Sequence, residues 1–248
     1  MKVSLITVCW NVAPVIAETL DSVFAQEHQD LEVIVIDGAS KDGTLDILET
    51  YRPRLAHLVS EKDHGIYDAM NKGLARATGD IIGFVNAGDL LMDPTVIKEV
   101  VKKFQTHKVD AVYGDIIMVD ENDISQVKRT WKSGDYHKSN FTKGWMPPHV
   151  ATFIRKSAYD SFGYFNTDLR IAADYEILFR FLYKHELATL HIPKVLVRFR
   201  LGGMSNGSVR HVLKANTKVR RSWRLNGFQA PPMLVTRKLW SKVMQFFH

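Results

Sequence analysis

Cysteine and long apolar runs are scarce in this sequence of 248 residues. Its single cysteine, Cys9, excludes an internal disulfide and any cysteine-based zinc cluster. Together with the lack of a signal peptide, this cysteine count predicts a reducing, cytoplasmic compartment. No apolar run approaches the roughly 18 residues that a transmembrane helix needs, so the sequence predicts no membrane span.

Acidic residues are absent from the last quarter of the chain. None follows Glu186, whereas 12 of the 33 Lys and Arg residues lie within residues 187–248. The first 186 residues hold 21 basic and 27 acidic side chains, so a mildly acidic body precedes a uniformly basic tail. Such a tail favours a polyanionic partner, for example lipid head groups, nucleic acid or a phosphorylated substrate. The alternative is a solvated helical face that happens to be basic.

The composition that remains is typical of a globular enzyme, with 46% apolar and 24% charged residues. Strand and helix patterns alternate through the first hundred residues, which predicts an α/β fold with a mostly parallel sheet and helices on both faces. The predicted strands span 3–8, 31–36, 58–60 and 80–85, and the helices between and after them 14–24, 44–51, 66–77 and 94–104. The later pattern is weaker, with predicted strands at 111–119, 127–131 and 195–199 and a helix at 174–184.

Polar clusters follow the predicted strands, at the sheet edge where α/β folds bind ligands. They are Thr7-Val-Cys-Trp-Asn11, the run from Asp37 to Thr44, the segment 61–73, and Asn86-Ala-Gly-Asp89. A carboxylate at a strand end could accept the N–H of a nucleobase, although a turn and helix cap would use the same residue types. The sequence contains neither the dinucleotide fingerprint G-x-G-x-x-G nor a P-loop, so a dehydrogenase or NTPase is not favoured.

The order of these clusters resembles the family-2 inverting glycosyltransferases of the GT-A fold, and within them the bacterial exopolysaccharide, O-antigen and colanic acid types. The motifs T-V-x-x-N, D-G-x-S-x-D-G-T, D-x-G-x-x-D-A-x-N-K-G and N-A-G-D appear in that order. Two further motifs, Pro148-His-Val-Ala-Thr-Phe153 and Ala172-Ala-Asp-Tyr-Glu176, extend the resemblance over roughly residues 3–200.

The resemblance implies a role for each matching residue. Asp37 matches the aspartate that pairs with the donor base, and Asp89 matches the carboxylate that binds a divalent cation, Mn²⁺ or Mg²⁺, on the donor diphosphate. Asp174 matches the catalytic base, and His149 the histidine near the metal and diphosphate. The implied donor nucleotide-binding residues are Thr7, Asn11, Asp37, Ser40, Asp68, Lys72 and Asn86, and the implied metal ligands are Asp89 and His149.

The chain departs from the commonest D-x-D-D motif, because Asn86 and Gly88 stand where two carboxylates could stand. One protein carboxylate would then bind the cation, so we expect weak metal affinity without the nucleotide. Asp89 is expected at a strand-end surface, where it would contribute little to stability. The chemistry fits a single displacement, in which a base takes the acceptor's proton and a cation stabilises the leaving diphosphate.

Simpler interpretations remain open for each site residue. Asp174 could cap a helix or pair with Arg180, and His149 could be an ordinary loop histidine. Glu61 and Asp63 could cap or pair rather than bind ligand. Trp10 and Trp145 receive no chemical role, and Cys9 is interpreted as a small buried hydrophobe.

The predicted function is metal-dependent, inverting transfer of a hexosyl or N-acetylhexosaminyl group from a nucleotide-sugar donor, UDP-linked rather than GDP- or TDP-linked, to a glycan or lipid-linked acceptor. The alternative is a non-catalytic nucleotide- or polyanion-binding module of the same fold. A nucleic-acid-binding protein is a further rival, but the two carboxylates argue against it, so no nucleic-acid partner is predicted.

The domain prediction places the transferase within 1–207, with the nucleotide-sugar part at 1–108 and the acceptor part at 109–207. The tail, 208–248, is predicted to form basic amphipathic helices at 209–225 and 233–248. These would contact an anionic membrane surface, peripheral on the inner face of the cell membrane, or else pack on the domain or a second subunit.

Overall fold

The computed structural model describes residues 1–202, 218–232 and 234, so most of the predicted tail helix 233–248 lies outside the described residues. Its strands are β1 (Val3–Cys9), β2 (Leu31–Asp37), β3 (His57–Ser60), β4 (Ile81–Phe84), β5 (Leu90–Leu91), β6 (Ala111–Val119), β7 (Val127–Trp131), β8 (Thr152–Arg155) and β9 (Thr189–Arg200). Its α-helices are α1 (Ala13–Phe24), α2 (Thr44–Tyr51), α3 (Ile66–Leu74), α4 (Val96–Thr106), α5 (Ser139–Thr142), α6 (Lys156–Phe162) and α7 (Ala173–Leu178).

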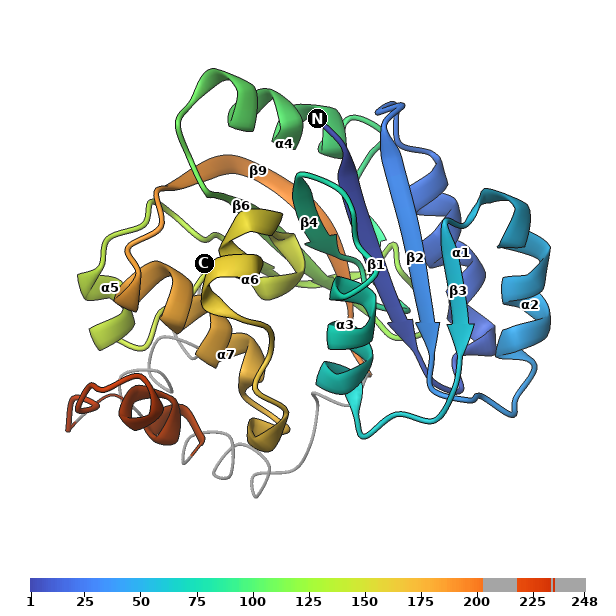
Figure 1. Cartoon of the computed structure of the whole chain (residues 1–248). Coiled ribbons are helices and arrows are strands. Elements are labelled where there is room, and N and C mark those ends of the chain that lie inside the picture. Colours follow the sequence, from blue (N-terminus) through green and yellow to red (C-terminus); the bar gives the residue numbers. More distant parts are fainter. Residues whose placement is uncertain (203–217, 233, 235–248) are drawn as a thin grey trace.

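The strands form one sheet in the order β3-β2-β1-β4-β8-β6-β9-β5, with β7 paired to β6 (Figure 1). β1 to β4 are parallel, whereas β8 runs antiparallel to both of its neighbours, β4 and β6. The predicted α/β class is therefore confirmed. The sequence did not predict β5, β8 or α6, because these are short elements with little apolar periodicity of their own.

Alternate residues of the central strands face two separate hydrophobic layers. Leu5 of β1 packs in the layer that contains α1, α2 and α4, whereas Ile6 packs with α3, α6 and α7 on the other side. Side chains along β1 are all buried, which is typical of a strand covered on both faces. Among the described residues, no helix is both long and apolar enough to cross a bilayer.

The described part of the tail packs on α7 and on the π-helical stretch that continues it (Phe179–Lys184). Residues 218–225 are helical, and Trp223 lies 4.5 Å from Phe179 and 5.1 Å from Tyr183 between ring centroids. The Trp223 indole donates a hydrogen bond to the Tyr175 hydroxyl at 2.9 Å. Because Val219 and Leu234 are also buried there, this part of the tail completes the core beneath α7.

Candidate active site

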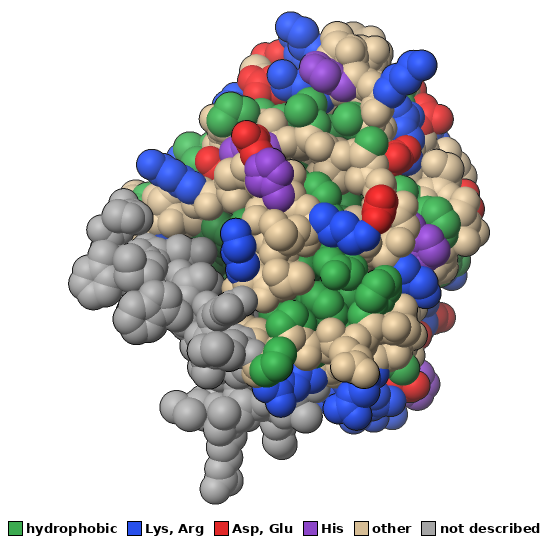
Figure 2. Space-filling view, turned by 90° about the vertical axis from the view of Figure 1, so that its left-hand side faces the viewer, with side chains coloured by type: hydrophobic (Ala, Val, Ile, Leu, Met, Phe, Trp, Pro, Cys, Tyr) green, Lys and Arg blue, Asp and Glu red, His purple; other side chains and the backbone are tan. Residues whose placement is uncertain are grey.

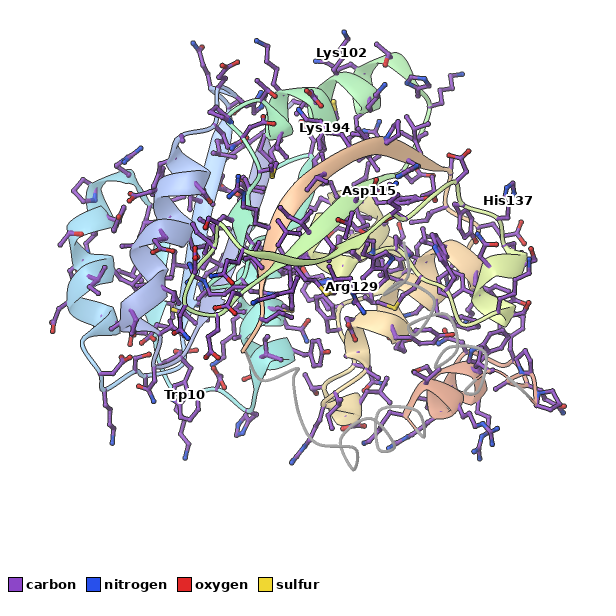
Figure 3. All side chains as sticks on the ribbon, turned by 180° about the vertical axis from the view of Figure 1, so that it is seen from behind. Trp10, Lys102, Asp115, Arg129, His137 and Lys194 are labelled. Atoms are coloured by element: carbon purple, nitrogen blue, oxygen red, sulfur yellow. The ribbon has the colours of Figure 1, made fainter. Side chains whose placement is uncertain are left out.

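The carboxyl ends of β1, β2 and β3 lie side by side. Strand register places Cys9 opposite Asp37 and Asp37 opposite Ser60, so the polar loops that follow begin at one edge of the sheet. Figure 1 shows these three strands pointing to the lower end of the molecule, and Figure 3 places Trp10 at that same end. Lys102 and Lys194 lie toward the opposite end, near α4 (Figure 3).

Asp37 organises this edge from a fully buried position. Its carboxylate accepts hydrogen bonds from the Ser40 N–H at 3.0 Å and the Ser60 hydroxyl at 2.6 Å, and also from the Ser40 hydroxyl. Asn11 ties the first loop to the second, because its N–H donates to Ser40 Oγ at 2.8 Å and its Oδ1 accepts from the Lys41 N–H at 2.8 Å. Three of the predicted donor residues, Asn11, Asp37 and Ser40, thus lie together and fix the loops that surround them.

Thr7 lies further back than its motif implied. It is within β1, fully buried, and its hydroxyl has no hydrogen-bond partner in the described part of the chain. The same motifs also secure the start of α1, because the N–H of its N-cap residue Val12 donates to Thr44 at the start of α2 at 2.9 Å and the Ala13 N–H donates to Asp42 of the preceding loop at 3.0 Å. Part of the family motif is therefore structural.

The third loop, between β3 and α3, is fixed by charge pairs. Lys72 binds Glu61 at 2.9 Å and lies 3.6 Å from Asp68, whose carboxylate also accepts the His64 N–H at 3.0 Å. The pairing interpretation of Glu61 therefore fits the structure. Asp68 and Lys72, both predicted to bind the donor, lie in this cluster, Asp68 in the first turn of α3 and Lys72 in its last turn.

Two side chains lie close to Gly38 above the strand ends: Trp10, to which the sequence assigned no chemical role, and Asp63, which it left open as a cap, an ion-pair partner or a ligand contact. Trp10 is 59% exposed directly after β1. A Cβ atom added to Gly38 would lie 2.6 Å from Asp63 Oδ2 and 3.3 Å from Trp10 Cδ1, so the glycine makes room for the carboxylate beside the indole. An exposed aromatic face next to a carboxylate suits a flat heterocycle with N–H donors. The signal in the sequence was an aromatic residue immediately after the first strand.

Asp89 occupies a less exposed position than expected. It is 4% exposed rather than at the surface, because β9 passes over it and the Arg200 N–H donates to its carboxylate at 3.3 Å. Burial raises the pKa of Asp89 to about 8, while the Arg200 N–H and the charge of Arg200 act in the opposite direction. The expectation of a surface carboxylate was therefore wrong.

The chemistry of this loop fits a hard cation. Beside the buried Asp89 carboxylate, Asn86 presents a buried Oδ1 with no hydrogen-bond partner among the described residues. Oxygen atoms of this kind are the ligands that Mg²⁺ and Mn²⁺ prefer. The described chain contains no group of three His, Cys, Asp or Glu side chains that could hold a metal.

Asp174 lies in the first turn of α7 and contacts the other half of the site. The Tyr67 hydroxyl of α3 donates to Asp174 Oδ1 at 3.2 Å. Neither simpler interpretation of Asp174 fits, because Ala172 is the N-cap residue and Arg180 pairs with Glu176 at 2.9 Å. Its carboxylate is thus connected to α3, the helix that carries Asp68 and Lys72.

His149 lies in the same region, in the short 3-10 helix His149–Ala151 that precedes β8. Its ring is enclosed by Phe84 and Phe165, with centroids 5.2 and 5.5 Å away. Burial lowers the pKa of His149, and the negative charge of the nearby Asp174 opposes that change. The structure therefore places His149 next to the predicted base, in a largely aromatic surrounding.

Comparison with known proteins shows the family to which this chain belongs. The model of the family described as glycosyl transferase family 2 matches residues 4–163. A PGL/p-HBAD biosynthesis glycosyltransferase of Mycobacterium tuberculosis (strain ATCC 25177 / H37Ra) is 32% identical over 247 residues, covering 97% of this chain and 91% of the relative. The chain belongs to glycosyl transferase family 2 and is a glycosyltransferase, as the resemblance implied.

Solved structures share the GT-A fold. TarS of S. aureus has a TM-score of 0.70 and 21% identity; the match covers 91% of this chain but only 39% of TarS. The mannosyltransferase PcManGT of Pyrobaculum calidifontis, in complex with GDP-Man and Mn²⁺, has a TM-score of 0.68 and 21% identity, covering 96% of this chain and 69% of PcManGT. Residues 1–349 of TarS in complex with UDP-GlcNAc give a TM-score of 0.66 at 20% identity, covering 99% and 78%.

Proposed function

We propose that this chain is a metal-dependent, inverting glycosyltransferase that moves a hexosyl or N-acetylhexosaminyl group from a UDP-sugar to a hydroxyl of a glycan or lipid-linked acceptor in bacterial polysaccharide or glycolipid synthesis. One observation supports this above the others. The helix that carries Asp68 and Lys72 of the donor segment also carries Tyr67, which bonds to Asp174. This hydrogen bond supports the proposal because it links the proposed donor segment to the proposed base.

The proposed roles follow from these positions. The loops fixed by Asn11, Asp37 and Ser40 would hold the nucleotide, with the base beside Trp10 and Asp63. Asp68 and Lys72 would line the diphosphate, and Asp89 with Asn86 would hold the cation. His149, assigned to the metal by resemblance, would support Asp174 and the diphosphate side.

The reaction needs one proton acceptor and one leaving group. Asp174 would take the proton of the acceptor hydroxyl while the oxygen of that hydroxyl bonds to the anomeric carbon of the sugar. The bond from the anomeric carbon to the diphosphate oxygen breaks in the same step. A bound Mn²⁺ or Mg²⁺ supplies positive charge that stabilises the departing nucleoside diphosphate. Attack from the face opposite the leaving group inverts the anomeric centre.

A matched pair of variants tests this assignment. Asp174→Asn should keep Mn²⁺-dependent UDP binding within about twofold and lower kcat by about 10²–10⁴-fold, the usual contribution of a general base. Asp89→Asn should instead lose the Mn²⁺ dependence of UDP binding, measured by titration calorimetry. Asp168→Asn, which alters an exposed carboxylate shortly before α7, is the control and should change neither quantity.

Two results would contradict the roles. If Asp174→Asn weakens UDP binding without lowering turnover, the residue binds and does not act as base. If Asp89→Asn retains Mn²⁺-dependent binding, the cation lies elsewhere. Parallel titrations with GDP test the preference for uridine, which we base on the resemblance, since the structural neighbours include complexes with UDP-GlcNAc and with GDP-Man.

We further propose that the chain works in the cytoplasm, peripheral on an anionic membrane surface. Helix 218–225 buries Val219, Ser222 and Trp223 and leaves Arg220, Arg221 and Arg224 exposed, beside a Leu225 that is 49% exposed. This helix lies at the lower end of the molecule, toward which β1 to β3 point (Figure 1). Lys and Arg side chains also gather along the lower margin of the adjacent face, beneath a group of hydrophobic side chains (Figure 2).

A further inference from the structure

Tyr67 connects two elements that lie far apart in the sequence. It belongs to the first turn of α3, and its hydrogen bond to Asp174 spans 107 residues. Its ring stacks on Phe165 at 5.6 Å, and Phe165 in turn contacts Phe84 and His149 at 5.5 Å each. The half-buried tyrosine is therefore held from the side, so its hydroxyl has a defined position relative to α7.

The Tyr67 hydroxyl stays protonated and can therefore always donate a hydrogen bond. Burial, and after it the negative charge of Asp174, raise the pKa of Tyr67. The phenol thus keeps its proton throughout the pH range in which an enzyme of this kind works. A phenol has a single proton to donate, and Tyr67 donates it to the Asp174 carboxylate.

We propose that Tyr67 is a positioning residue for the base: it occupies Oδ1 of Asp174 and so leaves Oδ2 as the oxygen that takes the acceptor's proton. This rests on the proposed function, in which Asp174 is the base. When one oxygen of a carboxylate accepts a hydrogen bond, the plane of the group is fixed and the other oxygen is left to accept a proton. An oriented proton transfer requires both conditions. The arrangement also ties the base to the helix that holds the donor segment.

Two further ionisable groups near Asp174 in the described part of the chain are His149 and Glu176, and neither donates a hydrogen bond to the Asp174 carboxylate. His149 faces it from the 3-10 helix before β8, where burial favours the neutral imidazole. Glu176, two residues along α7, is engaged by Arg180 and by the Asn226 side chain at 2.9 Å each. Tyr67 is therefore the side chain with a hydrogen bond to the Asp174 carboxylate among the described residues.

The test is a double-mutant cycle of Tyr67→Phe with Asp174→Asn. Tyr67→Phe keeps the ring that packs on Phe165 and removes only the hydroxyl. We expect kcat to fall about tenfold, since a hydrogen bond to an ionised group is lost. Mn²⁺-dependent UDP binding should stay within about twofold. The acid limb of the kcat profile should move to higher pH, because the lost bond favoured the ionised carboxylate.

In the Asp174→Asn background, Tyr67→Phe should cause no further loss of turnover. Tyr136→Phe is the matched control, because it removes a hydroxyl that donates to the Leu182 carbonyl at 2.8 Å from another half-buried tyrosine. Its pH profile should equal that of the unchanged chain.

Two outcomes would overturn the proposal and are distinguishable. If Asp174→Asn lowers turnover but Tyr67→Phe is equally damaging in both backgrounds, or leaves the pH profile unmoved, Tyr67 does not act through Asp174. If Asp174→Asn itself retains full turnover, Asp174 is not the base and both proposals fail.

Discussion

Glu32 shows how a single buried charge can be stabilised at a distance from the site. It is 5% exposed on β2, and burial alone would raise its pKa. Hydrogen bonds from Lys2, Ser4 and Thr78 outweigh burial and lower the pKa of Glu32 to about 2. The carboxylate thereby joins the starts of β1 and β2 to the turn before β4.

We predict from this pKa that the stabilisation by Glu32 depends on pH. Because the folded pKa lies below the unfolded value of about 4.5, the stabilising contribution is complete above pH 4.5 and is lost as the pH falls toward 2. A shift of this size corresponds to roughly 3 kcal/mol. In urea titrations, Glu32→Gln should differ most from the unchanged chain at pH 6, and the difference should shrink below pH 4.5 and largely vanish once the pH is below 2. Glu27→Gln, at an exposed pair with Lys98, is the control; a constant difference for Glu32→Gln would contradict the prediction.

Single residues also mark what the sequence could and could not predict about the site. Asn11, Asp37 and Ser40 were placed correctly at one edge, because residues that follow parallel strands meet there whatever the rest of the chain does. The burial of Asp89 depends on Arg200, 111 residues away, and the hydrogen bond of Asp174 depends on Tyr67, 107 residues away. Neither contact has a local pattern that would predict it.

At the scale of elements, the long periodic segments were predictable and the short antiparallel ones were not. α2 begins and ends at the predicted residues, since its apolar spacing and its Asp42-Gly43 start are both local. β8 has only four residues, and its place between β4 and β6 is set by long-range pairing. The predicted helix 174–184 is helical throughout but changes from α to π at Phe179.

Helix 218–225 supports α7 and should be required for stability. Trp223 is 2% exposed and in contact with Tyr175, Phe179 and Tyr183. We predict that Trp223→Ala lowers the free energy of unfolding by about 3–5 kcal/mol, the usual cost of removing a buried large aromatic side chain. Trp10→Ala, at an exposed position, should change it by less than about 0.5 kcal/mol. Denaturant titration measures both, and equal effects would show that helix 218–225 is not part of the core.

At the scale of the whole molecule, exposed Lys and Arg side chains form two separate groups. Helix 218–225 presents its arginines at the lower end, whereas Lys98 and Lys102 of α4 and Lys108 just after it form a second exposed basic group, with Lys102 near the opposite end (Figure 3). If the lower end faces lipid, the two basic groups will respond differently to charge reversal. The sequence predicted a basic tail but not the direction in which its arginines point.

We predict that the chain binds vesicles containing anionic lipid at low salt and does not bind neutral vesicles. Replacing Arg220, Arg221 and Arg224 together by Glu should reduce that binding by about 100-fold or more, since each cation near an anionic surface contributes about 1 kcal/mol. The same change at Lys98, Lys102 and Lys108 is the control and should have a much smaller effect. Equal losses for the two triple variants in co-sedimentation, or no binding by the unchanged chain, would refute the membrane orientation.

The docking of residues 218–232 and 234 onto α7 also has a consequence for the order of events during synthesis. β1 to β4 pair in parallel within the first 84 residues, and α1 to α3 lie in the same stretch, so the proposed nucleotide-binding edge can form early on the ribosome. α7, the helix that carries Asp174, lacks its packing partners Trp223 and Leu234 until these residues have been translated. We therefore expect growing chains to acquire donor binding before they acquire transfer, so that prematurely terminated chains do not glycosylate unintended acceptors.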